Sequence, residues 1–199
     1  SLSPNINYHP SSPKNGWGRK QSLTEGDCHY WGVWWGFEPF ANYSNKVGRF
    51  MSEYGFQGFP DLSFLKKYVE KSDTNDVSFR YHQQHGRGFE TIDTYMKRDY
   101  PVSDSFPDYA YVSQIMQADE IAEAVLKLKS ERKIIDFGLS NFTSSQTELI
   151  AQKTNVSYNQ IQFSATHHEA MLDGSLDYMQ VHDIRPMSWN PLGTVFRED

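Results

Sequence analysis

The sequence predicts an α/β fold in which parallel strands are flanked by helices, and two observations predict it. Between residues 133 and 189, short apolar segments alternate with stretches of helical spacing in the order β-α-β-α-β. This order implies right-handed crossovers within one parallel sheet. Earlier, the mostly apolar residues 47–51 are followed by Glu53 and Gly55. They indicate a buried strand that delivers the Glu53 carboxylate to its carboxyl end, where α/β barrels carry out their chemistry.

The first half of the chain predicts loops and helices around this strand. Residues 1–24 are rich in Pro, Ser, Asn and Gly and predict a loop, and residues 24–35 predict a strand end with an active-site loop. A helix is expected from residue 60 to about 71, then a polar surface loop to residue 87 and an amphipathic helix over 88–97. The inner face of the first helix is predicted to consist of Leu62, Phe64, Leu65 and Tyr68.

The second half predicts the regular alternation in detail. Apolar residues keep helical spacing from residue 107 to about 129, so one long helix is expected there. Thr143 and Gln146 form a capping box that opens a later helix. The elements expected after the long helix are a buried strand at 133–139, a helix to about 153, a strand at 158–163, a helix at 169–182 around Leu172, Leu176 and Met179, and a strand at 185–189.

Composition and charge exclude several classes of protein. The 199 residues suffice for one domain or two small ones, and the net charge of −6 argues against nucleic-acid binding, which needs a basic face. The sequence contains no run of about 18 apolar residues, so no membrane span is expected, and no signal peptide is recognisable. Cys28 is the single cysteine, so no internal disulfide is expected, and the compartment stays open between periplasm and cytoplasm.

A carboxylate among aromatic side chains predicts a carbohydrate site. Aromatic rings stack on the C–H faces of a sugar, while a carboxylate attacks or stabilises the anomeric carbon. Glu53 is the candidate catalytic residue, and the candidate residues that line the sugar pocket are Asp27, His29, Tyr30, Trp31 and Trp34. The alternative is an exposed loop glutamate beside core aromatics, since aromatic clusters belong more often to a core than to a binding surface.

No metal site is expected. His82 and His85 are spaced like a ligand pair, but no partner carboxylate or cysteine set accompanies them, so a solvated loop is favoured. Residues 167–169, His-His-Glu, have no second histidine four positions on and do not form a zinc-protease motif.

Specific motifs relate the first 119 residues to a known family. They lie at residues 25–34, 38–40, 48–57, 97–101 and 111–118. They closely resemble the β-mannosidases of glycoside hydrolase family 2. The resemblance implies a (β/α)8 barrel, a β-mannoside or manno-oligosaccharide as substrate, no cofactor, and Glu53 as the nucleophile of a retaining mechanism.

The resemblance also implies an incomplete catalytic pair. A retaining glycosidase needs a second carboxyl group about 5 to 5.5 Å from the nucleophile, which protonates the leaving oxygen. The family supplies it from an Asn-Glu pair on an earlier strand, and no Asn is followed by Glu in this sequence. A mannosidase-like fragment that is inactive alone is therefore expected.

A second set of motifs begins within the long helix, around residues 117–123. It comprises residues 137–142, 159–162 and 189–193 and resembles the aldo/keto reductases. The resemblance implies that Ser140, Asn141 and Gln160 bind the nicotinamide carboxamide of NADP(H) and that Trp189 stacks on its ring. A helix cap is the structural alternative for Ser140. The catalytic Asp, Tyr, Lys and His of that family lie on strands that precede this segment.

The two resemblances together predict a hybrid, partial (β/α)8 barrel. Residues 1–119 form a mannosidase-like fragment and residues 120–199 a reductase-like βαβαβ fragment, with open sheet edges that invite association. Aromatic residues divide accordingly, since 23 of the 30 precede residue 120. Three functions stay open: β-mannoside hydrolysis, a nicotinamide-dependent oxidoreductase lacking its catalytic residues, and neither activity.

Overall fold

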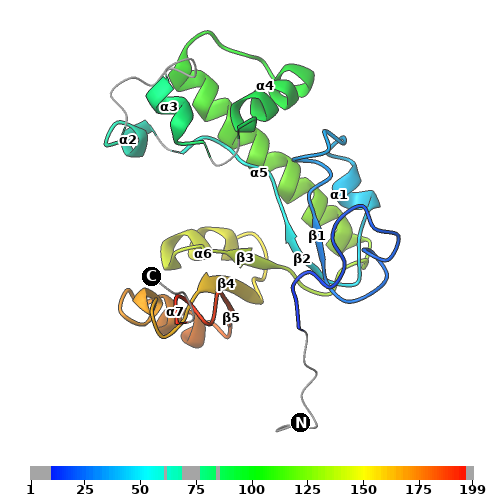
Figure 1. Ribbon diagram of the computed structural model, residues 1–199, viewed down its shortest axis with the longest axis vertical. Helices are drawn as coiled ribbons and strands as arrows, with labels where there is room; N and C mark the ends of the chain where they lie inside the picture. The colour runs from blue at the N-terminus through cyan, green and yellow to red at the C-terminus, as the bar shows by residue number, and fades with distance from the viewer. Residues whose placement is uncertain (1–9, 61, 69–76, 84–85, 196–199) are drawn as a thin grey trace, which may run out of the picture. The chain divides into compact units, whose positions relative to one another are not determined.

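The computed structural model describes residues 10–60, 62–68, 77–83 and 86–195 (Figure 1). The chain divides into two compact units, an N-terminal unit that ends at Lys127 and a C-terminal unit that begins at Leu128. The described helices include none that is both long enough and apolar enough to cross a membrane. Parallel strands with flanking helices confirm the predicted α/β class.

The N-terminal unit contains a pair of parallel strands, β1 (Cys28–Tyr30) and β2 (Met51–Tyr54) (Figure 1). The strand predicted at residues 47–51 is therefore wrong in its bounds, and Glu53 lies within β2 and not beyond it. The reason is the partner strand: β1 begins only at Cys28, whose register partner is Met51. A strand forms only where a neighbour supplies hydrogen bonds, and this information is not local to residues 47–51.

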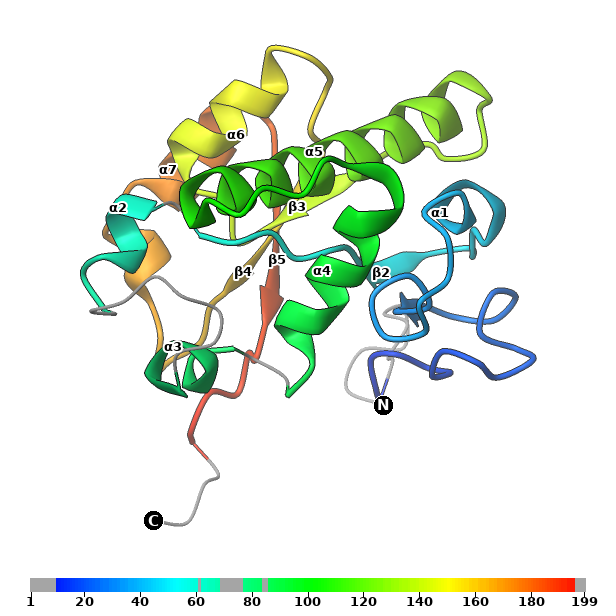
Figure 2. The same cartoon turned by 90° about the horizontal axis from the view of Figure 1, so that it is seen from above.

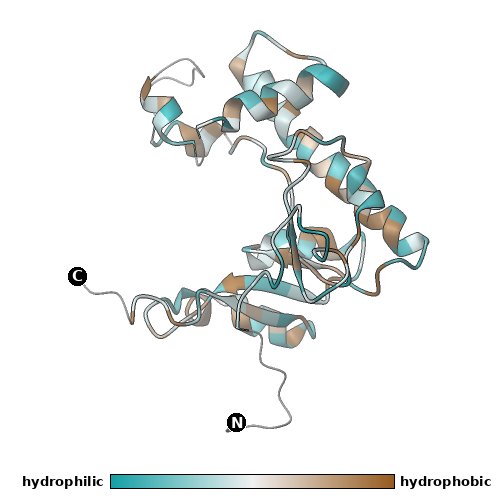
Figure 3. Cartoon of the chain, turned by 45° about the vertical axis from the view of Figure 1, so that its right-hand side comes forward, coloured by the Kyte–Doolittle hydropathy of each residue, from teal (hydrophilic) through white to brown (hydrophobic). Residues whose placement is uncertain are grey.

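The described part of this unit also contains helices, the last of which continues past Lys127. They are α1 (Asn42–Asn45), α2 (Leu62–Leu65), α3 (Val77–Tyr81), α4 (Gly88–Asp99) and α5 (Phe106–Ser130). The predictions of α4 and of the long helix α5 are confirmed. Apolar and polar residues alternate along these helices (Figure 3).

Two predictions around α2 and α3 are wrong. The helix from residue 60 to 71 is described only over Leu62–Leu65. Of its predicted inner face, Leu65 is buried and Leu62 packs against the core, whereas Phe64 and Tyr68 are 50% and 62% exposed. Residues 69–71 lie outside the described part of the chain. The predicted surface loop contains α3, because Phe79 is buried against Phe59 and Phe89 and anchors that turn. One apolar residue in a polar stretch gives no periodic signal.

Polar side chains of α5 hold the segment that follows β2. The side-chain amides of Gln117 and Gln114 donate to the carbonyl oxygens of Phe56 (2.7 Å) and Phe59 (2.9 Å). The Phe59 amide donates to Ser113 Oγ at 2.9 Å. A buried backbone group without a partner is costly, so these contacts stand in for strand pairing. They explain why a buried helix face carries Ser and Gln.

The C-terminal unit is a three-stranded parallel sheet with helices between its strands (Figure 1, Figure 2). The strand order is β3-β4-β5, which confirms the predicted β-α-β-α-β arrangement. Its elements are β3 (Gly138–Ser140), α6 (Ser144–Ala151), β4 (Tyr158–Gln162), the short 3-10 helix η1 (Glu169–Met171), α7 (Ser175–Val181) and β5 (Arg185–Trp189).

The predicted capping box is confirmed at the start of α6. The Gln146 amide donates to Thr143 Oγ1 at 3.3 Å, and the Thr143 amide donates to Gln146 Oε1 at 3.0 Å. Two backbone N–H groups that the helix cannot pair are satisfied reciprocally. This boundary was predictable because all of its determinants lie within four residues.

Two other boundaries in this unit are wrong. The strand predicted at 133–139 is reduced to β3, and Ile135 is 91% exposed. The helix predicted at 169–182 is divided by Gly174, whose φ of +82° belongs to the left-handed region. The Asp173 carboxylate accepts a hydrogen bond from the amide of Ser175, the first residue of α7, at 2.8 Å. Leu172, predicted to be packed, is 78% exposed.

The sheet of the C-terminal unit buries one face. Ile161 and Met179 belong to its core, and Leu139 packs against it. Residues on the other face, such as Ser140, Gln160 and Trp189, are exposed or half-buried. In the described part of the chain, β3 and β5 each have a strand on one side only. This agrees with a partial barrel, and association through these edges stays a prediction.

Candidate functional site

The N-terminal unit brings Glu53 and His29 together across neighbouring strands. The two residues are register partners in β1 and β2, and His29 Nδ1 lies 3.3 Å from Glu53 Oε2. The side chain of His29 is 19% exposed and that of Glu53 is 42% exposed. The carboxylate is thus both ordered by a partner and open to a ligand.

Asp27, immediately before β1, accepts hydrogen bonds from three directions. The donors are the hydroxyls of Ser12 (2.6 Å) and Ser52 (2.8 Å) and the Lys14 amide (2.7 Å). Burial alone would raise the pKa of Asp27, but these hydrogen bonds outweigh it and hold the pKa below the ordinary value. Asp27 is therefore an ionised acceptor at neutral pH.

Ser12 connects Asp27 to His29. Its Oγ lies 2.6 Å from Asp27 Oδ2 and 3.2 Å from His29 Nε2. A continuous chain of polar contacts thus runs from Asp27 through Ser12 and His29 to Glu53. Sequence reasoning did not single out Ser12, because it lies 15 residues before Asp27 in a segment that predicts only a loop.

The three predicted aromatic residues of this site lie in different environments. Tyr30 and Trp34 are 2% and 5% exposed and belong to the core, and Trp31 is half-buried and packs against that core. The Trp34 ring meets Phe56 edge to face, with centroids 4.9 Å apart. The structure brings Asp27 and His29 to Glu53, whereas the rings of Tyr30 and Trp34 are not open to a ligand.

Glu38 is the centre of a second carboxylate cluster, which includes Tyr30 of β1. Its Oε2 accepts from the Tyr30 hydroxyl, from Asn42 Nδ2 at 2.8 Å and from Lys46 Nζ at 2.7 Å. Burial would raise the pKa of Glu38, but these three donors lower it below its usual value. The pKa of Tyr30 is raised, first by burial and then by Glu38. The neutral Tyr30 hydroxyl is therefore a structural donor.

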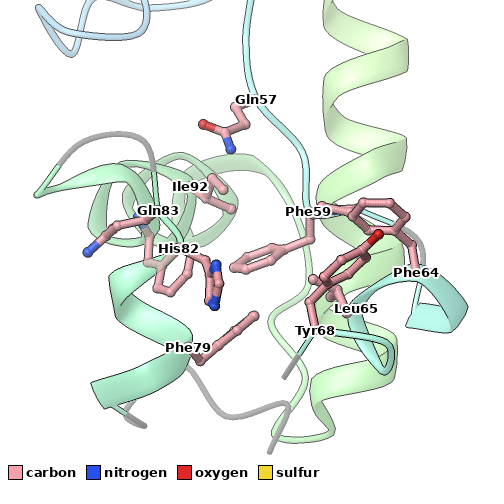
Figure 4. A pocket seen from close by; sticks show the side chains of 11 residues that line it. Gln57, Phe59, Phe64, Leu65, Tyr68, Phe79, His82, Gln83 and Ile92 are labelled. Carbon is pink, nitrogen blue, oxygen red and sulfur yellow. The ribbon is translucent and has the colours of Figure 1, made fainter. Parts of the chain in front are cut away.

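An apolar cavity of about 310 Å³ lies elsewhere in the N-terminal unit. Figure 4 shows rings from α2, α3 and the segment after β2 gathered around it, among them Phe59, Phe64, Tyr68 and Phe79. None of the described residues that line it carries a carboxyl group. This cavity therefore does not supply the second carboxyl group that a retaining mechanism requires.

The C-terminal unit gathers the other predicted residues at the carboxyl ends of its strands. Trp189 Nε1 donates to Asn141 Oδ1 at 2.9 Å, which links the end of β5 to the residue after β3. Ser140 is the register partner of Gln160, and the Asn141 amide donates to the Gln160 carbonyl oxygen at 2.7 Å. All four predicted residues thus meet along one edge of the sheet.

A buried asparagine that sequence reasoning missed fixes the turn after β3. Asn159 is 1% exposed; its Nδ2 donates to the Phe142 carbonyl oxygen at 2.8 Å, and its Oδ1 accepts from the Phe142 amide at 3.4 Å. Asn141, the residue before Phe142, adopts a left-handed φ of +57°. The adjacency of Asn159 to Gln160 in the motif was the one available signal.

Among the described residues, no group of three or more His, Cys, Asp or Glu side chains is arranged to hold a metal ion. His82 belongs to the wall of the apolar cavity, and His85 lies outside the described residues.

A family model described as the aldo/keto reductase family matches residues 71–199. The chain belongs to the aldo/keto reductase family. The oxidoreductase YdhF of Escherichia coli is 38% identical over 89 residues, which cover 43% of this chain and 30% of that protein. The matched part of the chain is thus similar to oxidoreductases.

The aldo/keto reductase chain is also similar to β-mannosidases. Beta-mannosidase B of Aspergillus flavus is 32% identical over 127 residues, covering 59% of this chain and 14% of that protein. The enzyme of Thermothelomyces thermophilus is 32% identical over 145 residues, covering 65% of this chain and 16% of that protein. A crystal structure of the β-D-mannosidase of Dictyoglomus thermophilum matches with a TM-score of 0.48 and 29% identity, over 51% of this chain and 13% of that one.

The similarity to two families confirms the mixed nature expected from the motifs. The chain spans 30% of the oxidoreductase and 14% of the first mannosidase, so it corresponds to a part of each. The family match begins at residue 71, and the compact units divide at 127 and 128. The boundary between residues 119 and 120 stays a prediction.

Proposed function

We propose that the N-terminal unit accepts a mannosyl group from β-mannosides on Glu53, the first half of a retaining glycosidase reaction. The contact between His29 Nδ1 and Glu53 Oε2 at 3.3 Å carries this proposal, because it orders a carboxylate that is still 42% exposed. The similarity to β-mannosidases supports mannose as the sugar. Asp27 and His29 line the approach to Glu53.

The chemistry follows from the residues that are present. A carboxylate oxygen of Glu53 attacks the anomeric carbon, a C–O bond to the enzyme forms, and the bond to the leaving oxygen breaks with its electron pair. An alkoxide is a poor leaving group and needs a proton from a second carboxyl group. A dinitrophenolate leaves without a proton. We therefore expect adduct formation from activated mannosides and very slow turnover of natural ones.

The test is intact-protein mass spectrometry after incubation with 2,4-dinitrophenyl 2-deoxy-2-fluoro-β-mannoside. We expect one added fluoromannosyl group per chain, and none in Glu53→Gln, which keeps the shape of the side chain but lacks the nucleophilic charge. Peptide mapping should place the adduct on β2. A soluble, folded wild-type chain without adduct, or an equal adduct in Glu53→Gln, would overturn the proposal.

A second function is favoured by the hydrogen bond between Trp189 and Asn141. It holds the indole against Asn141, which follows Ser140 and whose amide donates to the Gln160 carbonyl oxygen. This arrangement suits a nicotinamide ring whose carboxamide needs donors and acceptors. Membership of the aldo/keto reductase family supports NADP(H) as the ligand. We therefore propose that the C-terminal unit binds the nicotinamide end of NADP(H), with Trp189 stacked on the ring.

Ligand-observed NMR tests this binding. Wild-type protein should transfer saturation to the nicotinamide protons of NADP⁺, and Trp189→Ala should weaken the affinity about tenfold, the equivalent of about 1.4 kcal/mol for a lost ring stack. Trp17→Phe, which changes an exposed tryptophan of the other unit, is the matched control. Unchanged affinity in Trp189→Ala would exclude its stacking role.

A further inference from the structure

The ring of His29 is held at both nitrogens. Nε2 lies 3.2 Å from Ser12 Oγ, and Nδ1 lies 3.3 Å from Glu53 Oε2. Ser12 and Ser52 both approach Asp27 Oδ2, at 2.6 and 2.8 Å. The sequence places these residues in three separate segments, and only the pairing of β1 with β2 and the loop before them bring the groups together.

The hydrogen-bond partners indicate which groups of this cluster donate and which accept. An ionised carboxylate only accepts hydrogen bonds, so the single hydroxyl proton of Ser12 goes to Asp27. Ser12 Oγ can then only accept from His29, which requires a proton on Nε2. Glu53 also only accepts, which requires a proton on Nδ1. All the contacts are satisfied together when the ring carries both protons.

We propose that His29, as a doubly protonated ring clamped by Ser12 and Asp27, is the positioning residue for the nucleophile Glu53. It holds Oε2 so that Oε1 is presented to the anomeric carbon. Within the described part of the chain, His29 is the polar partner of the Glu53 carboxylate. This inference rests on the proposed mannosyl-accepting function of Glu53 and adds the residue that orients it.

A purely stabilising role is a poor explanation of this contact. Both partners are partly exposed, and exposed ion pairs contribute little to stability. The same unit contains another carboxylate cluster at Glu38, whose Oε2 accepts from the core residue Tyr30 and from Lys46. Orientation of the reacting group, in contrast, is worth up to about 100-fold in rate for a displacement of about 1 Å.

The first experiment measures the rate of adduct formation with the activated fluoromannoside across concentrations. We expect His29→Gln to lower the maximal rate about 10- to 100-fold, with a smaller change in the half-saturating concentration, since the contact that is lost is the one to Glu53. Ser12→Ala should give a smaller decrease of the same kind. Added imidazole should restore part of the rate to His29→Ala. A structural role would not produce this separation or this rescue.

His167→Gln is the matched control. His167 Nε2 lies 3.2 Å from Glu169 Oε2, a similar histidine–carboxylate contact in the C-terminal unit. Its loss should leave the rate of adduct formation unchanged. An equal rate in wild type and His29→Gln would overturn the positioning role.

A second experiment does not depend on mannoside. In proton–nitrogen NMR spectra at about pH 6, with histidine labelled, both ring N–H groups of His29 should be visible because hydrogen bonds slow their exchange. Ser12→Ala should remove the Nε2–H signal, and Glu53→Ala, which has no acceptor, the Nδ1–H signal. Absence of either signal in wild type would overturn the proposal. If no adduct forms but both signals follow this pattern, the clamp stands and the mannosyl-accepting function fails.

Discussion

Replacing Tyr95 with alanine is expected to destabilise the N-terminal unit by about 3–5 kcal/mol. The side chain has no exposed surface, and its ring centroid lies 4.8 Å from the rings of both Phe40 and Phe56. Its hydroxyl donates to the Val33 carbonyl oxygen and lies 2.7 Å from that of Glu38. Burial raises the pKa of Tyr95 to about 12, so this hydroxyl stays a neutral donor. Alanine removes both the aromatic contacts and the donor.

Tyr95→Phe separates the two contributions. The ring is kept, and we expect a loss of about 1–3 kcal/mol from the carbonyl oxygens left without their donor. Hydrogen exchange followed by mass spectrometry measures the effect on the N-terminal unit alone, which matters because a chain with two units need not unfold in one step. Peptides from α4 should lose protection in both variants, more in alanine. Equal loss in both would mean that the ring packing contributes little.

The elements that the sequence predicted correctly are those with local determinants. The capping box of α6 lies within four residues, and the period of α4 and α5 is repeated along each helix. Strand β5 was predicted with its observed bounds, and β4 was predicted one residue too long. Asn141 and Trp189 were named together only through the resemblance to the aldo/keto reductases, and the structure joins them by a hydrogen bond.

The elements predicted incorrectly depend on partners that are distant in the sequence. The bounds of β2 are set by β1, and α3 is set by the burial of Phe79 against Phe59 and Phe89. Residue type also does not separate a core ring from a binding ring. Trp34 was expected to line a pocket, but its partner Phe56 places it in the core.

The candidate sites show the same division between local and distant information. Glu53 was identified from its motif, and β1 brings Asp27 and His29 to it. Ser12, which completes the chain of contacts, is identified only by its distances in the folded unit. Polar networks join segments that have no sequence pattern in common, because a hydrogen bond constrains two atoms and not the residues between them.

Each unit has a core of its own, and this bears on how mutations should be read. The aromatic core of the N-terminal unit includes Tyr95 and Met116, whereas Ile161 and Met179 belong to a separate core in the C-terminal unit. A substitution in one core is expected to change hydrogen exchange in that unit first. Tests of Glu53 and of Trp189 therefore need a stability measurement in the matching unit.

In the C-terminal unit, Asn159→Ala is expected to cost about 2–4 kcal/mol. The side chain is 1% exposed and satisfies both the carbonyl oxygen and the amide of Phe142. Alanine leaves these two partly buried backbone groups without partners and opens a small cavity in β4. The turn that carries Asn141 in its left-handed conformation loses its anchor. The affinity for NADP⁺ should fall as well, because Asn141 is no longer held in place to accept the hydrogen bond from Trp189.

Thr147→Val is the matched control for this effect. Thr147 is also 1% exposed, and its hydroxyl donates to the Thr143 carbonyl oxygen at 2.9 Å. That oxygen still accepts from the Thr147 amide at 2.9 Å, so valine leaves no group unpaired and should cost less than about 1 kcal/mol. Hydrogen exchange of peptides from β3 and β4 measures both variants. A similar loss of protection in the two would show that burial of the side chain, and not its two hydrogen bonds to Phe142, sets the stability of the turn.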